Sequence, residues 1–387
     1  MYVPIHSLTK SDICSVLSIA FPQDGGEKRK TYLDRHNNRR LMLLLLNQLI
    51  QTPRNERLIK LINDCHPTIQ WPNVRKTIIY LRNQTEPYQR QYSPGHIGAY
   101  WELRVPMKLT VLNRSRSLIN KYCPKGFLPS QLKIYWNYHQ IESLTTCNFY
   151  NTVADTRARH TLLTWPVNKR KNQGTIDYLT MAIDSALLNV PKGKQAIVLD
   201  FADERIPGGN FLEGVYMQEQ AILHHSTGYR ALLDFKYKMM GSGYFIPEFG
   251  VLYVKNVQFF RPTGLLTRFA DLIVAACYDL TGARGLYRLP SPHDEADIRS
   301  RTFRKFRAII ASAVTNSEKD GSDTYLLLGP IGTGAFNNSM EMIASLFAEV
   351  LNNSLMNSDG PIRYAFDKIW FVSPANLDVF KKTFEAY

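Results

Sequence analysis

The amino-acid sequence predicts an α/β fold in which helices cover both faces of a sheet. From about residue 150 onward, short apolar runs suited to buried strands alternate with segments whose apolar residues recur every three or four positions, as on one face of a helix. Two of the predicted strands also run directly into glycine-rich loops, each followed by a predicted helix. Alternating strands and helices of this kind form a sheet with helices packed on each side.

The expected elements follow from these patterns. Strands are expected at residues 195–201, 250–254, 271–276, 324–329 and 368–372. Helices are expected at residues 155–165, 175–188, 217–233, 299–313, 339–351 and 377–384. Before residue 150, helical spacing appears at residues 7–19, 34–51 and 57–64, so this region is expected to be mainly helical.

The net charge of +14 is unevenly distributed along the chain. Residues 1–150 hold 21 Lys and Arg against 9 Asp and Glu, whereas residues 151–387 hold 26 against 24. A basic region joined to a nearly neutral one is typical of proteins that bind nucleic acid or another polyanion. The alternative is a basic surface that is simply solvated.

Residues 98–138 mix aromatic with basic side chains, a combination that can stack on bases while following a phosphate backbone. No recognised RNA- or DNA-binding motif accompanies them, so ordinary packing of aromatic rings under a basic surface is the favoured interpretation. The aromatic residues are Tyr100, Trp101, Tyr135, Trp136 and Tyr138, and the basic ones are Arg104, Lys108, Arg114, Arg116, Lys121, Lys125 and Lys133.

Several classes of protein are disfavoured. No stretch reaches 18 uninterrupted apolar residues, so we expect no membrane-spanning segment. Lys10 and Asp12 interrupt the region where a signal peptide needs an apolar core. Five scattered cysteines without a CxxC pair, and histidines that do not cluster, indicate an intracellular protein with free thiols, no metal site and no cofactor; the compartment is left open.

The two glycine-rich loops are the candidate binding elements. One contains Pro207-Gly208-Gly209-Asn210, and the other spans residues 329–336. Both follow the carboxyl end of a predicted strand, where open α/β sheets bind ligands. Glycine allows close approach of the backbone, and the following helix start offers N–H groups to a phosphate. Neither loop has the sequence of a P-loop or of a dinucleotide-binding fingerprint.

The residues around the first loop resemble a family signature. Residues 199–220 are similar to the signature of the microbial-type poly(ADP-ribose) glycohydrolases, in which an Asp- and Asn-containing strand is followed by three glycines, a spacer and Gln-Glu-Glu. Residues 226–233 and 328–338 resemble the same family in the same order. The resemblance is strongest over residues 195–387. It implies a macrodomain-like three-layer α/β/α fold with a mixed sheet and a ligand that is ADP-ribose or poly(ADP-ribose).

The resemblance also implies a role for each matching position. Asp200 would contact the adenine end, whereas Phe336 would pack on the distal ribose. Residues 208–209 would approach the diphosphate and distal ribose, and residues 332–334 would close on the diphosphate. Tyr244 would cover the ligand, and Phe371 would stack on adenine. The full ligand-binding set that the resemblance implies is Asp200, Gly208, Gly209, Asn210, Gln218, Tyr244, Gly332, Thr333, Gly334, Phe336 and Phe371.

Three positions depart from the family pattern, all at the chemical end of the site. Asn210 replaces the third glycine, and Asp203 stands where the family has an Asn that holds the distal ribose. Gln220 replaces the second Glu, whose carboxyl in the family protonates the leaving oxygen and then activates water. Glu219 is retained, and Asp203 adds a carboxylate nearby. Two neighbouring carboxyls could raise the pKa of one of them and create a substitute acid. The expected catalytic set is therefore Glu219, Asp203 and the degenerate position Gln220.

We therefore expect a basic, mainly helical accessory region at residues 1–150 and a macrodomain at residues 151–387. Two functions are compatible with this arrangement. In the first, the domain recognises ADP-ribose or poly(ADP-ribose), with metal-free hydrolysis of ribose–ribose bonds in doubt because of Gln220, and residues 1–150 hold the polymer or a nucleic acid. In the second, the macrodomain is catalytically retired and serves as a structural or nucleic-acid-binding part of a larger assembly. The substitution at Gln220 favours loss of catalysis.

Overall fold

The computed structural model describes residues 119–146, 155–204, 206–209, 211, 217–235, 246–260, 267–281 and 294–387. The helices expected within residues 1–64 and the site candidates Asn210 and Tyr244 lie outside these ranges. The chain divides into two units, Met1–Leu112 and Asn113–Tyr387, and everything that follows concerns the second. This division falls earlier in the chain than the expected boundary at residue 150.

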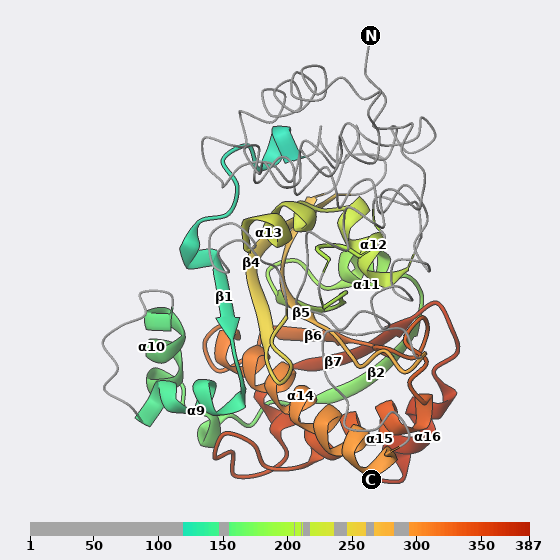
Figure 1. Cartoon of the computed structure of the whole chain (residues 1–387). Coiled ribbons are helices and arrows are strands. Elements are labelled where there is room, and N and C mark those ends of the chain that lie inside the picture. Colours follow the sequence, from blue (N-terminus) through green and yellow to red (C-terminus); the bar gives the residue numbers. More distant parts are fainter. Residues whose placement is uncertain are drawn as a thin grey trace, which may run out of the picture. The chain divides into compact units, whose positions relative to one another are not determined.

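A seven-stranded sheet of strand order β1-β4-β5-β3-β6-β7-β2 forms the centre of this unit (Figure 1). The β1–β4 and β4–β5 pairs are antiparallel, and the other four pairs are parallel. The mixed α/β sheet predicted from the sequence is therefore confirmed. The strands are β1 (Leu132–Tyr135), β2 (Thr175–Thr180), β3 (Gln195–Phe201), β4 (Val251–Phe260), β5 (Thr267–Ala275), β6 (Thr324–Leu328) and β7 (Lys368–Ser373).

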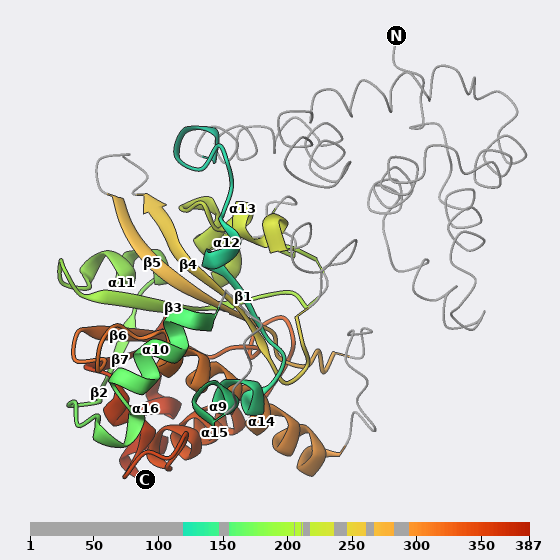
Figure 2. The same ribbon diagram turned by 90° about the vertical axis from the view of Figure 1, so that its left-hand side faces the viewer.

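Helices lie on both faces of the sheet, as the two views in Figures 1 and 2 show. One face carries α11 (Ile183–Asn189), α12 (Gln218–His224) and α13 (Gly228–Asp234). The other carries α9 (Tyr138–Thr146), α10 (Thr156–Thr164), α14 (Glu295–Asn316), α15 (Met340–Asn352) and α16 (Asp378–Glu385). Short 3₁₀ turns occur at Pro129–Gln131, Val167–Lys169 and Ile362–Ala365. Within the described ranges, no helix is long and apolar enough to cross a membrane.

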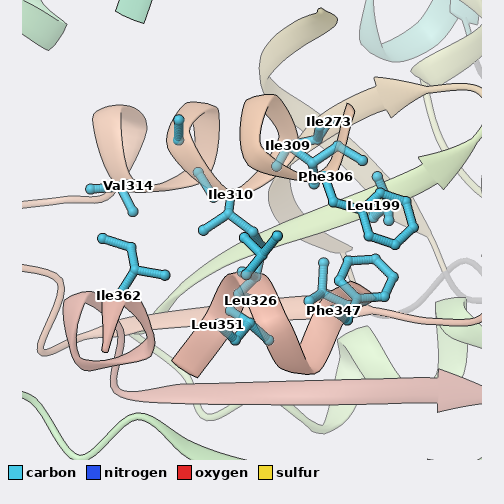
Figure 3. Packing of buried hydrophobic residues seen from close by; sticks show 14 of the residues in the cluster. Leu199, Ile273, Phe306, Ile309, Ile310, Val314, Leu326, Phe347, Leu351 and Ile362 are labelled. Carbon is cyan, nitrogen blue, oxygen red and sulfur yellow. The ribbon is translucent and has the colours of Figure 1, made fainter. Parts of the chain in front are cut away.

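Helix α14 is the main support of the sheet on the second face. Its side chains at Phe306, Ile309 and Ile310 recur at helical spacing and are at most 1% exposed. They meet Leu326 of β6 and Phe347 of α15 in the core shown in Figure 3. The burial of these side chains positions the helix against the sheet, because each contributes about 1.5–3 kcal/mol when fully removed from water.

Several expected elements have different bounds in the structure. The predicted helix at residues 175–188 is wrong in its first half, where Thr175–Thr180 forms edge strand β2 before α11 begins. Ile176 and Tyr178 of β2 both pack on the core, the two-residue alternation of a strand rather than helical spacing. The predicted helix at residues 217–233 is divided into α12 and α13 by an isolated bridge between Ser226 and Phe259.

The aromatic and basic residues before residue 138 belong partly to the sheet. Tyr135 of β1 is fully buried, and Lys133 is buried with its Nζ donating to Asn316 Oδ1 at 3.1 Å. The packing interpretation is therefore confirmed for these two side chains. Trp136 differs, because it follows β1 and is 49% exposed.

The carboxyl ends of β1, β3, β5 and β6 meet at one edge of the sheet, where β4 begins. The register aligns Tyr135 with Val251 and Phe201 with Ala275 along this edge. Both glycine-rich loops leave the sheet here, after β3 and β6. The topology thus places them where parallel sheets of this class bind ligands.

Candidate functional site

The two glycine-rich loops start from neighbouring parallel strands. β3 pairs with β6, and a Cβ added at Gly329, which follows β6, would lie 2.9 Å from Cζ of Phe201 at the end of β3. The loops are therefore in contact from their first residues. A ligand that contacts both loops requires this proximity.

The first loop brings its glycines against the start of helix α12. Gly208 and Gly209 have positive φ values of 76° and 48°, a region that residues with a side chain rarely adopt. A Cβ at Gly209 would lie 3.3 Å from Cβ of Asp203, 3.3 Å from Oε2 of Glu219 and 3.7 Å from Nε2 of Gln220. The backbone of Gly209 therefore lies among all three residues predicted for catalysis.

Gln218 fastens α12 to the end of β3. Its Oε1 accepts from the N–H of Phe201 at 3.0 Å, and its Nε2 donates to the carbonyl of Leu199 at 2.6 Å. Both polar ends of the amide are thus used on the backbone of the strand. The structure gives Gln218 a positioning role for the helix that carries Glu219.

Glu219 and Asp200 are two buried carboxyls that interact electrostatically. Asp200 is fully buried and Glu219 is 3% exposed. Neither oxygen of Asp200, nor Oε1 of Glu219, has a hydrogen-bond partner among the described residues. Burial raises the pKa of Asp200 to about 8. Burial, then the charges of Asp200 and Asp203, raise the pKa of Glu219 well above its ordinary value, while the backbone N–H groups of Asp203 and Gly208 lower it in part.

Neighbouring carboxyls act on the pKa of Glu219 in the direction expected for one member of the carboxyl pair, but the main partner differs from the expected one. The larger charge effect comes from Asp200, which was assigned to adenine, and the smaller one from Asp203. No exposed oxygen of Asp200 is available to a ligand in this structure. Its contact with adenine stays a prediction, which this buried position does not favour.

Gln220 is held by two hydrogen bonds, one that its side chain accepts and one that it donates. Its Oε1 accepts from the N–H of Met217 at 3.1 Å and so caps the start of α12. Its Nε2 donates to the carbonyl of Gly208 at 3.2 Å. An ionised carboxylate could accept the first bond but could not donate the second. The amide at the degenerate position thus holds the glycine loop onto the helix.

The second loop is anchored on the far side of β3. A Cβ at Gly332, whose φ is 79°, would lie 2.5 Å from Cβ of Cys277, which follows β5. Asn338 Nδ2 donates to the carbonyls of Tyr278 at 2.8 Å and Gly332 at 3.0 Å, and the N–H of Leu280 donates to the carbonyl of Phe336 at 2.9 Å. Because β3 lies between β5 and β6, this loop passes across the end of β3.

The tip of the second loop is open. Gly334 is exposed, and a Cβ added to it would meet nothing within 4 Å. Within the described ranges, the N–H groups of Gly334 and Phe336 donate to no protein acceptor. Thr333 turns its hydroxyl back onto the carbonyl of Pro330 at 2.8 Å, and Phe336 packs partly on the core. The tip offers N–H donors of the kind that bind phosphate oxygens.

A buried lysine lies behind this loop. Nζ of Lys305, on α14, is 4.6 Å from the ring centroid of Tyr278, and burial lowers the pKa of Lys305 to about 7. Burial also raises the pKa of Cys277 to about 12, which keeps its thiol protonated. Lys305, Tyr278 and Cys277 therefore support the second loop, and the protonated thiol of Cys277 is not a nucleophile.

One predicted site residue is misplaced. Phe371 is fully buried, with ring centroids 4.9 Å from Phe380 and 5.5 Å from Phe347, so it belongs to the core beneath β7 and is not free to stack on adenine. Asn338 is a residue that the sequence analysis missed as a loop anchor. Its position just before the predicted helix at residues 339–351 was the available signal.

The described ranges contain no group of three or more His, Cys, Asp or Glu side chains that could hold a metal ion. The polar groups gathered around Gly209 are carboxyls and an amide, which suit hydroxyl and ribose recognition.

A family model matches the part of the chain that contains the first loop. Residues 137–262, which include the first loop and α12, match the family model for the catalytic domain of microbial-type poly(ADP-ribose) glycohydrolase, PARG. The predicted resemblance to microbial-type PARG is confirmed. The matched segment covers about a third of the chain and ends before the second loop. The search of curated proteins found no match.

Solved PARG structures are also similar to this chain. The enzyme of Deinococcus radiodurans in complex with ADP-ribose is 20% identical, with a TM-score of 0.48, over 67% of this chain and 99% of that one. The enzyme of Thermomonospora curvata is 17% identical, with a TM-score of 0.48, over 79% of this chain and 98% of that one. A second structure of the T. curvata enzyme, bound to the inhibitor ADP-HPD, is 17% identical, with a TM-score of 0.45, over 79% of this chain and 97% of that one.

Proposed function

We propose that this site recognises ADP-ribose, both free and as the terminal unit of poly(ADP-ribose). The observation that carries the proposal is the position of Gly209, a bare backbone with positive φ among Asp203, Glu219 and Gln220 at the carboxyl edge of a PARG-like sheet. Carboxyl and amide groups around a glycine can bind the hydroxyls of a ribose that approaches the backbone closely.

The second loop supports the diphosphate end of the same ligand. Its N–H groups at Gly334 and Phe336 face no protein acceptor within the described ranges, and the loop crosses the end of β3 toward the first loop. Backbone N–H groups at such a turn bind phosphate without requiring a lysine. The two loops thus supply complementary chemistry to the two ends of a ribose–diphosphate group.

Cleavage of ribose–ribose bonds is the part of the family activity that this site supports least. The amide of Gln220 delivers no proton near neutral pH and is committed to Met217 and Gly208. Glu219 lies beside Gly209, and burial together with neighbouring carboxyls raises its pKa, which favours the protonated form that an acid needs. We assign the site to recognition first, with slow hydrolysis through Glu219.

The alternative is a retired macrodomain that works only as a structural or nucleic-acid-binding component. The hydrogen bond from Gln220 to Gly208 favours this alternative, because the first loop is held by the residue that stands in place of the acid. The two hypotheses differ in one measurable property, since a retired scaffold has no need to bind ADP-ribose.

Calorimetric titration of the full chain with ADP-ribose tests the choice. We expect a Kd in the micromolar range, and absence of binding at millimolar ligand would refute recognition and leave the retired scaffold. The diagnostic variant is Gly334→Val. Its side chain meets no other part of the protein, but it would occupy the space that a bound diphosphate needs. We expect at least a tenfold loss of affinity with an unchanged melting temperature. Gly360→Val is the matched control, because a Cβ there meets only Cδ2 of Tyr364 at 3.9 Å.

A further inference from the structure

A second group of side chains at the same edge of the sheet is not used by the proposed site. It consists of Trp136 and Tyr138 after β1, Phe249 before β4, and Arg304 and Arg307 on α14, and it is called the Arg–aromatic surface below. It contains the last part of the aromatic and basic segment noted in the sequence. Tyr135 and Lys133 of that segment are buried, so the exposed remainder needs its own explanation.

Both arginines of this surface lie over aromatic rings. Cζ of Arg304 is 3.8 Å from the ring centroid of Phe249, and Cζ of Arg307 is 4.1 Å from that of Tyr138. The two arginines are three positions apart on α14 and so lie on the same side of the helix. Arg307 also forms a side-chain hydrogen bond with Tyr138, whose ring it covers. A guanidinium over one ring can still offer its opposite face to a base and its remaining N–H groups to phosphate oxygens.

The exposed indole of Trp136 belongs to the same surface. Asn137 forms an isolated bridge with Phe249, and a Cβ at Gly250 would lie 2.7 Å from the carbonyl carbon of Trp136. The backbone of Trp136 is therefore directly beside residues 249–250, while its side chain is 49% exposed. The indole is exposed, and its backbone adjoins Phe249, the ring that carries Arg304; exposed aromatic rings and arginines are what proteins use to stack bases.

The charge of this surface is not neutralised by ion pairs within the described ranges. Arg299 and Arg301 of the same helix pair with Glu349 at 2.6 Å and with Glu248 at 2.8 Å. Arg304 and Arg307 form no such pair in the part of the chain that the structure describes.

Glu248, which precedes Phe249, is already paired with Arg301. Glu142 contacts the surface through Tyr138: its Oε1 accepts from the hydroxyl of Tyr138 at 2.5 Å, and its Oε2 is 3.6 Å from Nδ1 of the exposed His139. Two arginines against one carboxylate leave the surface positive and suited to an anion.

The distance from this surface to the proposed site follows from the strand order. β1 and β3 are separated by β4 and β5, hence by three strand spacings, or about 14 Å along the edge. Helix α14 also carries Lys305, which lies over Tyr278, and the carbonyl of Tyr278 holds Asn338 of the second loop. The Arg–aromatic surface and the diphosphate loop therefore rest on one rigid helix.

We propose that the Arg–aromatic surface binds the ADP-ribose unit next to the one held between the two glycine loops, so that the domain holds two consecutive units of poly(ADP-ribose). Adenine stacks on Trp136 and on the outer face of Arg304, and phosphate oxygens accept from the guanidinium edges of Arg304 and Arg307. The inference rests on the proposed recognition of ADP-ribose. Poly(ADP-ribose) is favoured over nucleic acid because the surface shares its helix and its sheet edge with the ADP-ribose site.

The test compares a monomer with a polymer on the full chain. Wild type and the double variant Arg304→Gln/Arg307→Gln are titrated with ADP-ribose and with a poly(ADP-ribose) oligomer of defined length. We expect the double variant to bind the oligomer at least tenfold more weakly, with unchanged affinity for ADP-ribose. The slope of log K against log salt should become shallower by about 1.4, from the loss of two single-strand phosphate contacts.

Two further variants separate the charge and stacking contributions. Arg299→Gln, on the same helix but paired with Glu349, should leave both affinities unchanged. Trp136→Ala should weaken oligomer binding several-fold, and Trp136→Phe should restore most of it, since a phenyl ring still stacks. Trp136 is exposed, so neither substitution creates a cavity in the core.

The outcomes distinguish the two proposals. Unchanged oligomer affinity in the double variant, with ADP-ribose still bound by wild type, overturns the Arg–aromatic inference alone. Absence of ADP-ribose binding by wild type overturns the proposed function, and with it the two-unit arrangement. Equal or tighter binding of single-stranded DNA of the same charge, lost in the double variant, makes the partner a nucleic acid and also rejects the inference.

Discussion

The two glycine loops leave adjacent strands at one edge of the sheet, yet they are held in opposite ways. In the first, Gly208 packs on Leu223 of α12 and Gly209 lies beside buried Glu219, so folding and acid chemistry share the same contacts. In the second, Gly332 packs tightly on Cys277, but Gly334 meets nothing. Substitutions in the first loop should therefore change stability and chemistry together, whereas in the second loop the two effects can be separated.

The largest expected effect concerns the carboxyls under the first loop. Burial raises the pKa of Asp200 to about 8, so the folded protein keeps this proton up to about pH 8, whereas the unfolded chain loses it near pH 4. The stability associated with this group is complete below about pH 4 and is lost as the pH rises to about 8, by up to about 1.4 kcal/mol per pH unit. The raised pKa of Glu219 acts in the same direction.

Asp200→Asn should therefore flatten the decline of the unfolding free energy with pH and make the variant several kcal/mol more stable than wild type at pH 8. Urea denaturation between pH 5 and pH 8 measures this slope. Exposed Asp359→Asn is the control and should leave the slope as in wild type. An unchanged slope in Asp200→Asn would show that its carboxyl is ionised and paired in solution.

The next effect tests the contrast within the second loop. Gly332→Ala places a Cβ 2.5 Å from Cβ of Cys277 at a positive φ, so it should destabilise the protein by about 3 kcal/mol. Gly334→Ala, two residues away in open space, should change the unfolding free energy by less than about 0.5 kcal/mol. Urea denaturation of both variants checks the pair, and equal losses would contradict the difference between base and tip.

A smaller loss of stability than that of Gly332→Ala is expected for Gln220→Glu. The new carboxylate would face the carbonyl of Gly208, which now accepts from the amide, so we expect a loss of about 2 kcal/mol at pH 8. The loss should shrink toward pH 5, because a protonated carboxyl can donate to that carbonyl. The same proton can serve the leaving ribose oxygen, so we also expect faster release of ADP-ribose from the polymer than in wild type.

Denaturation and product release, both measured from pH 5 to pH 8, check the two parts of this prediction. Gln220→Ala should lose stability without any gain in release. If wild type hydrolyses the polymer efficiently and Glu219→Gln leaves that rate unchanged, Glu219 is not the acid of this site.

Local pattern was sufficient for the central strands and their loops. β3 and β6 are continuous apolar runs that end in glycine-rich turns, and both were predicted within one residue of their observed bounds. Edge strands were harder to predict. β2 was taken for a helix, and β1 was missed within a mixed aromatic and basic segment, because short edge strands carry polar residues and rely on partners far away in the sequence.

The candidate site shows the same limit. The residues around Gly209 were predicted from the signature, but Phe371 was placed at the ligand and lies in the core. A buried strand residue and a ligand-stacking residue have the same apolar character in the sequence, and only the packing of α15 and α16 over β7 distinguishes them.

The sequence alone determined the α/β class, the two glycine loops, the PARG-like signature and the loss of the second Glu at Gln220. Tertiary structure decided what these residues do. It paired Glu219 with Asp200, committed the amide of Gln220 to the carbonyl of Gly208, and set Arg304 and Arg307 on aromatic rings beside the site. The physical reason is that pKa shifts, side-chain hydrogen bonds and ion pairing depend on neighbours from other strands and helices. Glycine turns and apolar strands, in contrast, can be recognised from residues that are adjacent in the sequence.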